Sequence, residues 1–332
     1  MSIFEKSVAY RPFKYPKFVE AEKKHRVDMH WTETQVELAD DLRQYNSKGG
    51  LETPNVTHER HKLLLDKLLP LFTEMDSSVG AGYCQLLPHV GNNETRSLLM
   101  TQAAREITHF KGYALANETF GFPESSWVEF HEYEEMQEKI DLLTPSNADL
   151  SISLNWCYLL GQILLGEGIA LFGSFTCLLN FKRFGLLMGF NDVNSWSLND
   201  ENDHIENNIA ILNAAREDLT EAEERALNGF LTTTADKFVE AEHKFIDLVL
   251  EDGELEDLPK ESLKGYLTYL GKYRLFQLGL IGSLEVPENP LKWMDWMLSA
   301  SKHDNFFEKR VTDYSHNGLE GEIDYDKYMT NT

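Results

Sequence analysis

The residues whose types and spacing suggest chemistry are two pairs of glutamate and histidine. Glu106 is followed three residues later by His109, and Glu201 is followed three residues later by His204. Residues three apart on an α-helix are neighbours on one face. Each pair can therefore direct a carboxylate and an imidazole at the same point, which is the arrangement needed to bind a metal ion.

A lone acidic residue in apolar surroundings precedes each pair. Asp76 precedes the first pair and Glu167 the second, at nearly equal separations along the chain. Glu74 competes with Asp76, but Asp76 shares its face with apolar residues at three- and four-residue spacing. Carboxylates on core-facing stripes need a cationic partner. Two Glu-x-x-His helices and one carboxylate from each of two others form the dinuclear site of metal-carboxylate helix bundles. The predicted metal ligands are Asp76, Glu106, His109, Glu167, Glu201 and His204.

The Glu-x-x-His spacing occurs twice more, in stretches rich in charged residues. Glu22 precedes His25, and Glu240 precedes His243, but both pairs stand among lysines and glutamates. Such charge patterning is typical of a solvent-exposed helix face. We therefore predict that neither of these pairs binds metal.

Composition limits the function further. The chain has 332 residues, 42% of them hydrophobic, and 31 basic against 55 acidic residues give a net charge of −24. This excess of negative charge argues against nucleic acid or an anionic membrane surface as a partner. Cys84, Cys157 and Cys177 have neither zinc-site spacing nor a disulfide pattern, which favours reduced thiols and a cytoplasmic location. No signal peptide is recognisable, and we expect no run long enough to span a bilayer.

Helical periodicity predominates along the chain, and strand-like alternation is almost absent. The fold predicted is all-α, a ferritin-like helical bundle with the metal site in its core. We expect an irregular N-terminal arm over 1–31, a helical domain over 32–301 and a flexible acidic tail over 302–332. The helices are expected over 32–48, 57–78 (kinked at Pro70), 93–119, 129–141, 151–189, 195–214, 220–251 and 259–281, followed by a short helix containing Trp293 and Trp296.

The extended motif Glu106-x-x-His109-x-x-x-Tyr113 resembles a known family, the small, radical-generating subunit of class I ribonucleotide reductase. Asp200 directly before Glu201 fits the same resemblance, which covers most of the chain. It implies that the six predicted ligands bind two iron or two manganese ions. It also implies that Tyr113, one helical turn beyond His109, carries a stable tyrosyl radical.

The resemblance further implies a route for moving the radical to a separate large subunit. Trp31 resembles the tryptophan of that route, and Asp200 would bond both to Trp31 and to His109. Near the end of the chain, Tyr314 resembles the tail tyrosine of the family. Tyr325 and Tyr328 compete for the same assignment.

The implied function is that of a ribonucleoside-diphosphate reductase small subunit, active only with its large subunit in reducing ribonucleotides to deoxyribonucleotides. The acidic tail would dock into the large subunit, an extended-segment mode of recognition. The chain itself is expected to form a homodimer.

Two positions depart from the family pattern, and two other functions stay open. Leu171 replaces a phenylalanine that commonly lines the radical pocket, although Phe175 remains, and Asn199 stands where an arginine often precedes the Asp-Glu pair. A hydrocarbon desaturase or hydroxylase would need an apolar substrate channel and would not need Tyr113. A ferritin-type iron-binding protein would need neither Trp31 nor a tail. Oxygen and nitrogen ligands accept both iron and manganese, so the metal stays open.

Overall fold

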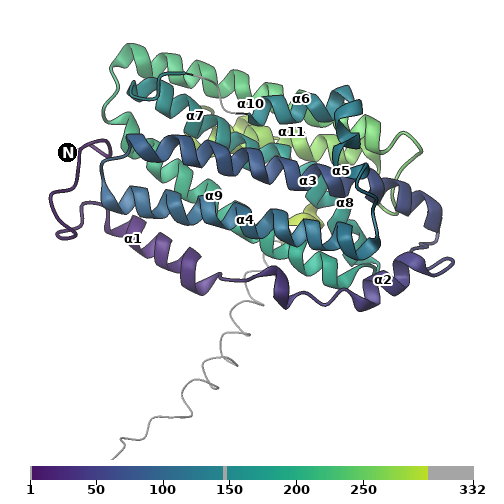
Figure 1. The fold of residues 1–332 in the computed structure, drawn as a ribbon. Helices are drawn as coiled ribbons and strands as arrows, with labels where there is room; N and C mark the ends of the chain where they lie inside the picture. The colour runs from purple at the N-terminus through teal and green to yellow at the C-terminus, as the bar shows by residue number, and fades with distance from the viewer. Residues whose placement is uncertain (1, 145–147, 298–332) are drawn as a thin grey trace, which may run out of the picture.

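Long helices lying side by side form one elongated bundle (Figure 1). The computed structural model describes residues 2–144 and 148–297, and among these there is no β-strand, only an isolated bridge between Leu255 and Leu258. The predicted all-α class is therefore confirmed.

The main helices correspond to the segments with apolar periodicity. Their bounds are α1 Pro16–Lys23, α2 Ala39–Asn46, α3 His58–Leu86, α4 Asn93–Phe120, α5 Ser126–Glu129, α6 Glu134–Leu143, α7 Ser153–Leu165, α8 Phe172–Arg183, α9 Met188–Arg216, α10 Glu221–Val249 and α11 Lys260–Gln277. Residues 292–297 are also helical, at the position expected for the short helix with the two tryptophans.

The N-terminal region is more ordered than the sequence suggested. Residues 16–23 form α1, and a π-helical turn, η1 (Lys24–Asp28), continues it. The expectation of an irregular arm is wrong for this part, because Phe18 and His25 are buried and hold the segment against the bundle. A single helix over 32–48 is also wrong. The capping box of Thr32 and Gln35 is present, but it caps only a short 3₁₀ turn, and α2 follows separately.

Local sequence signals fix the ends of several helices, including α4, which carries two of the predicted ligands. The side chain of Asn92 accepts a hydrogen bond from the backbone of Thr95 at the start of α4, and Gly121 ends α4 with a φ of 79°. A left-handed residue after a helix favours glycine. The predicted capping box of Thr220 and Glu223 begins α10. Pro70 lies inside α3, which continues to Leu86.

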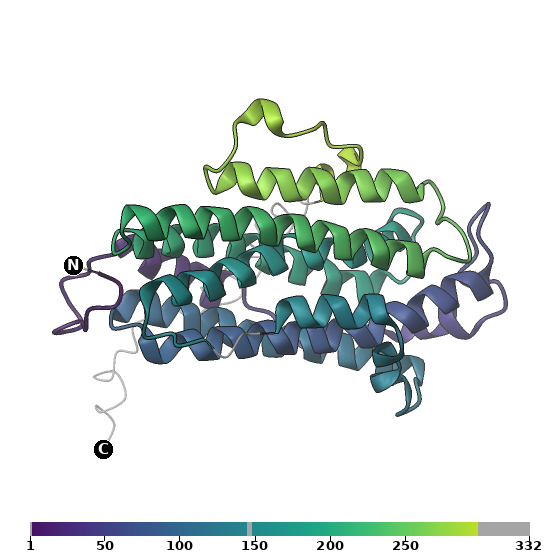
Figure 2. The same cartoon turned by 90° about the horizontal axis from the view of Figure 1, so that it is seen from above.

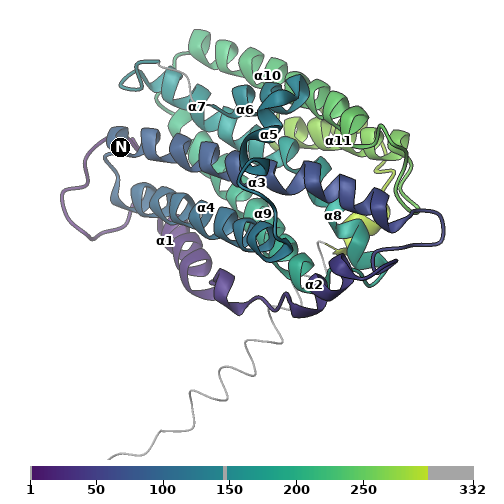
Figure 3. The same cartoon turned by 45° about the vertical axis from the view of Figure 1, so that its right-hand side comes forward.

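Four elements surround the centre of the bundle. Helices α3 and α4 pack closely along their length, and α7 and α9 pack against each other and against this pair. Figure 3 shows α1 along the outer side of α4, and Figure 2 shows α11 as an outer layer on the side of α10. The centre is therefore covered on both sides by further helices, which keeps solvent away from polar groups placed there.

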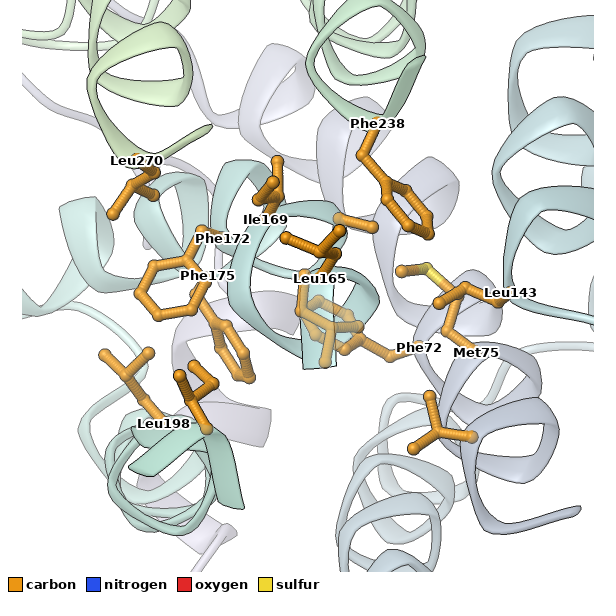
Figure 4. Packing of buried hydrophobic residues seen from close by; sticks show 14 of the residues in the cluster. Phe72, Met75, Leu143, Leu165, Ile169, Phe172, Phe175, Leu198, Phe238 and Leu270 are labelled. Carbon is orange, nitrogen blue, oxygen red and sulfur yellow. The ribbon is translucent and has the colours of Figure 1, made fainter. Parts of the chain in front are cut away.

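The expected long helix over 151–189 is interrupted by a π-helical turn, η5 (Gly166–Ala170), between α7 and α8. Figure 4 shows Leu165 and Ile169, at this turn, among side chains such as Phe72 and Phe238 that come from neighbouring helices. Each large side chain buried in this way contributes about 1.5–3 kcal/mol. A π turn inserts an extra residue in the helix and is frequent at functional sites.

Our expectation that no segment is long enough for a membrane span was wrong. By length and composition alone, Ser153–Arg183 is long and apolar enough to cross a membrane, and the mean hydropathy of its most apolar stretch is 1.6. However, 94% of that window is buried inside the bundle. A helix that is apolar on all sides is typical of a protein core as well as of a membrane.

Candidate metal centre

The structure brings all six predicted ligands together in the middle of the bundle. They form two overlapping groups of buried side chains whose ligand atoms lie within 4.8 Å of one another. Both groups share Glu106 and Glu201. The first group adds Asp76 and His109, and the second adds Glu167 and His204. Two groups that share two carboxylates would suit two neighbouring metal ions held between carboxylates and histidines.

In both histidines the same ring nitrogen faces the carboxylates. Nδ1 of His109 lies 3.3 Å from an oxygen of Glu106 and 3.1 Å from an oxygen of Glu201. Nδ1 of His204 lies 3.2 Å from Glu106, 3.1 Å from Glu167 and 3.3 Å from Glu201. The Nε2 atoms therefore point away from the cluster, toward other partners.

Several atoms of the cluster have no hydrogen-bond partner among the described residues. They are Oδ2 of Asp76, both carboxylate oxygens of Glu106, both carboxylate oxygens of Glu201, and Nδ1 of His109. Buried polar atoms are nearly always satisfied. Unpartnered oxygen and nitrogen atoms that converge on one point therefore fit divalent cations, and the donor set of carboxylates and imidazoles suits iron and manganese.

Electrostatics lead to the same conclusion. Burial raises the pKa of Asp76 well above its usual range, and the nearby charge of Glu106 raises it further. Burial likewise raises the pKa of Glu167 to about 8. Burial also opposes ionisation of Glu106, but His109 and His204 bring its pKa down to about 2. Even with the two histidines present, burial leaves Asp76 and Glu167 favouring their neutral forms, and added positive charge would offset this.

Behind His109 lies a hydrogen-bonded chain that leads toward the surface. Nε2 of His109 donates to Oδ2 of Asp200 over 3.0 Å, and Nε1 of Trp31 donates to the same oxygen over 2.8 Å. The rings of Trp31 and His109 are stacked, with centroids 5.8 Å apart. Asp200 therefore bonds to both groups, as the family resemblance implied.

A guanidinium forms an ion pair with Asp200, but it belongs to Arg105 and not to the position of Asn199, where the family often has an arginine. Arg105 on α4 lies 3.3 Å from Asp200 and donates to the backbone carbonyls of Trp31, His25 and Met29. Burial opposes the charge on Asp200, yet the bond from His109 and the charge of Arg105 lower its pKa. The sequence indicated Asn199 at the usual arginine position, and it gave no signal that α4 would supply the charge instead.

Trp31 can lie close to α4 because Gly112 has no side chain. A Cβ atom at Gly112 would be 3.5 Å from the ring of Trp31 and 2.8 Å from a methyl group of Val193. On its outer side, Trp31 borders a cavity of about 70 Å³ that Trp196 and Asp200 also line.

Tyr113 is fully buried one turn beyond His109. Its ring stacks on Phe72, with centroids 4.4 Å apart, and meets Phe190 edge-on at 5.9 Å. Its hydroxyl neighbours that of Ser197, but the two do not meet the geometry of a hydrogen bond, and no other described residue bonds to it. Burial raises the pKa of Tyr113 far above its usual value, and the charge of Asp76 adds to this. The ring is thus held in a dry aromatic pocket beside the carboxylate cluster.

A polar network that the sequence analysis missed holds Glu167. The hydroxyl of Tyr83 lies 2.8 and 2.9 Å from the two carboxylate oxygens of Glu167 and donates to them. The same hydroxyl accepts from Gln102 over 2.9 Å and from Asn208 over 2.7 Å, and Asn208 also donates to Glu167. Tyr83 lies two helical turns beyond Asp76 on α3. This spacing places both side chains on one face of the helix, and it was the one feature of the sequence that could have indicated Tyr83.

His25 corrects one prediction. It is fully buried, and its Nε2 lies 3.0 Å from Nε2 of His204. Burial lowers its pKa, which keeps the ring neutral. The neighbouring lysines, Lys23 and Lys24, are exposed, but the His25 side chain between the turn and the bundle is buried. Glu240, in the other extra motif, is exposed as predicted, and His243 bonds to the backbone of Lys264 instead of reaching the cluster.

The three candidate tail tyrosines lie outside the described residues, so their positions stay predictions. They are Tyr314, Tyr325 and Tyr328.

Fold and site together define a class, the helix-bundle proteins that hold two metal ions between carboxylates and histidines. Comparison with known proteins gives the family. Residues 7–290 match the family model described as ribonucleotide reductase, small chain. The chain therefore belongs to the small-chain family of ribonucleotide reductase.

Individual relatives agree with this assignment. A probable ribonucleoside-diphosphate reductase small subunit of Invertebrate iridescent virus 3 is 29% identical, covering 94% of this chain and 85% of that protein. The ribonucleoside-diphosphate reductase subunit beta of Chlamydia pneumoniae is 27% identical, covering 86% and 84%. Among solved structures, the ribonucleotide reductase R2 subunit from Clostridium botulinum has a TM-score of 0.71 at 17% identity, covering 90% of this chain and 99% of that one. The dimanganese(II)-NrdF of Streptococcus sanguinis has a TM-score of 0.68 at 16% identity, covering 87% and 99%.

The chain is thus a small subunit of class I ribonucleotide reductase, an enzyme that reduces ribonucleotides to deoxyribonucleotides, and it works with a large subunit. The family and the buried cluster indicate a dinuclear metal site. The desaturase and ferritin alternatives are not favoured.

Proposed function

We propose that this subunit forms a tyrosyl radical on Tyr113 beside a pair of iron or manganese ions and passes the oxidising equivalent to its large subunit. The proposed metal ligands are Asp76, Glu106, His109, Glu167, Glu201 and His204. When bound, the metal pair supplies the one-electron oxidant. Every other part of the task falls to side chains, which hold the metals, exclude water and connect Tyr113 to the surface.

The observation that carries the proposal is the hydrogen-bonded chain from His109 through Asp200 to Trp31. Metal storage or hydrocarbon oxidation needs no such connection. An oxidisable indole bonded to a buried carboxylate can give up its electron while the proton stays within hydrogen-bond distance of Oδ2. Arg105 keeps Asp200 charged and in place.

The environment of Tyr113 suits a long-lived radical. Phe72 and Phe190 enclose the ring, and no described residue bonds to its hydroxyl. Oxidation of a phenol releases its proton as well as an electron. Asp76 is close enough for its charge to act on the Tyr113 hydroxyl.

We propose that the C-terminal tail continues the route beyond Trp31. We propose that the acidic segment 302–332 binds the large subunit and that Tyr314 relays the radical there. Replacing Tyr314 by Phe should leave the metals and the Tyr113 radical intact and abolish turnover with the large subunit. Turnover that persists would move the assignment to Tyr325 or Tyr328.

Three finer features complete the proposal. The solved neighbour with two manganese ions supports manganese as a candidate beside iron. Family membership supports a homodimer. The cysteines are free, and two of the three are buried, which supports a reducing, cytoplasmic location.

Replacing Trp31 by Phe tests the proposal directly. The variant should show the Tyr113 radical by electron paramagnetic resonance but should lose turnover with the large subunit, because phenylalanine has no N–H group and is far harder to oxidise. Trp196→Phe is the matched control, since Trp196 packs against Trp31 without bonding to Asp200. Full turnover in the Trp31 variant would contradict the proposed route.

A further inference from the structure

His25 lies beneath the second half of the cluster, on the π-helical turn η1 (Lys24–Asp28). Its ring centroid is 4.7 Å from that of His204, and the two Nε2 atoms are 3.0 Å apart. Arg105 binds the backbone carbonyl of His25, which fixes the turn against α4. This is a specific contact between two fully buried imidazoles, made by a segment that none of the six predicted ligands belongs to.

The geometry determines which nitrogen carries the proton. Nδ1 of His204 faces oxygens of Glu106, Glu167 and Glu201 at 3.1 to 3.3 Å, so Nδ1 is the atom available to a cation. A neutral imidazole that binds a cation through Nδ1 has its proton on Nε2. That proton points at Nε2 of His25, which must therefore be the acceptor.

The proton of the His25 ring itself then faces a carboxylate. With Nε2 accepting, the proton of His25 is on Nδ1, which lies 3.5 Å from Oδ2 of Asp203. Asp203 in turn forms an ion pair with Lys24, which is half exposed. His204, His25, Asp203 and Lys24 thus lie in sequence from the cluster to the surface, with a charge contact of 3.5 Å and no hydrogen bond of good geometry between His25 and Asp203.

We propose that His25 is a positioning residue for the metal ion bound through His204. By accepting the Nε2 proton it fixes the tautomer and the ring orientation that present Nδ1 to the cation. Partners behind a metal-binding histidine commonly have this effect, and their removal costs about 10- to 100-fold in metal affinity. The inference rests on the proposed function, because it takes the carboxylate–histidine cluster to be the metal site.

Binding of Mn²⁺ alone, without oxygen and without the large subunit, tests this role. In the full-length chain, free Mn²⁺ is titrated and its hydrated signal is followed by electron paramagnetic resonance, which yields the two affinities. His25→Phe fills a similar volume but cannot accept a hydrogen bond. His25→Gln offers an amide oxygen as acceptor. His243→Phe is the matched control, because His243 belongs to another Glu-x-x-His motif and bonds elsewhere.

We expect His25→Phe to keep one wild-type affinity and to weaken the other by about 10- to 100-fold. His25→Gln should bring the weakened affinity back to within a few-fold of wild type, and His243→Phe should bind like wild type. Thermal unfolding of each metal-free variant shows whether the fold is retained.

Two results would overturn the role of His25. One is two wild-type affinities in the His25→Phe variant. The other is an equal loss at both metal positions that His25→Gln does not restore, which would make His25 a support for the fold. A wild-type chain that binds no Mn²⁺ would instead contradict the proposed metal centre itself, so the two failures are distinguishable.

Discussion

The two halves of the metal centre share ligand types but differ in what lies behind them. Behind His109 is a charged group, Asp200, which pairs with Arg105 and bonds to Trp31. Behind His204 is a neutral imidazole, His25. The surroundings of the carboxylates differ in the same way.

On the first side, one oxygen of Asp76 has no partner, whereas on the second side both oxygens of Glu167 accept from Tyr83. These contrasts indicate that the bundle assigns different tasks to the two halves. The side with charge and an indole connects the centre to the surface, which suits electron transfer. The side with neutral donors and acceptors holds its ligands in fixed positions before any metal binds. A carboxylate behind a histidine also makes that ligand more basic.

The largest expected effect comes from the two carboxylates that both halves share. Glu201→Ala should abolish binding of both metal ions, because Glu201 belongs to both groups. Asp76→Ala and Glu167→Ala should each abolish only one, since each belongs to one group. Metal quantitation after gel filtration measures the outcome. If the Glu201 variant kept both ions, Glu201 would not be a ligand that the two halves share.

A smaller effect is expected from a substitution in the first half alone, at Asp200. Asp200→Asn keeps the shape of the side chain but removes the charge that Arg105 balances, so turnover with the large subunit should fall by about 10- to 100-fold. Asp66→Asn is a matched control, because Asp66 also accepts from an aromatic residue, Tyr45, away from the centre. Steady-state assays of both variants provide the measurement. Unchanged turnover in the Asp200 variant would remove the proposed exit through the first half.

The smallest effect concerns the two tyrosines of the centre. Tyr83→Phe leaves Gln102, Asn208 and Glu167 short of a buried partner and should lower the free energy of unfolding of the metal-free protein by about 1–3 kcal/mol. Tyr113→Phe removes a hydroxyl that has no partner, so its cost should be close to zero. Denaturant unfolding of both variants compares them. Equal destabilisation would mean that the Tyr83 network contributes nothing to stability.

Much of this architecture could be predicted because helical periodicity reports which residues share a face. The all-α class and the convergence of the six cluster residues, from Asp76 to His204, follow from stripes and spacings along single helices. The residues that were missed depend on packing between helices. Arg105 and Tyr83 act across to α9 and η5, and a pattern within one helix does not reveal its neighbour.

The π-helical turns explain a second kind of error. His25 lies in one such turn and Glu167 in another, where an extra residue changes the direction of the following side chains. For His25 the flanking exposed lysines suggested a solvated face, yet the turn buries the imidazole. For Glu167 the ordinary helical spacing still placed the carboxylate inward, because both neighbouring turns are apolar.

We propose that a metal pair in this bundle produces a radical on Tyr113. The most direct test is electron paramagnetic resonance after reconstitution with ferrous iron and oxygen, and separately with manganese and an activating oxidant, for the wild-type chain and for Tyr113→Phe. We expect a tyrosyl signal in the wild type, its loss in the variant, and about two metal ions per chain in both. Two bound metals without a radical under any reconstitution, or a tyrosyl signal that persists in Tyr113→Phe, would contradict it.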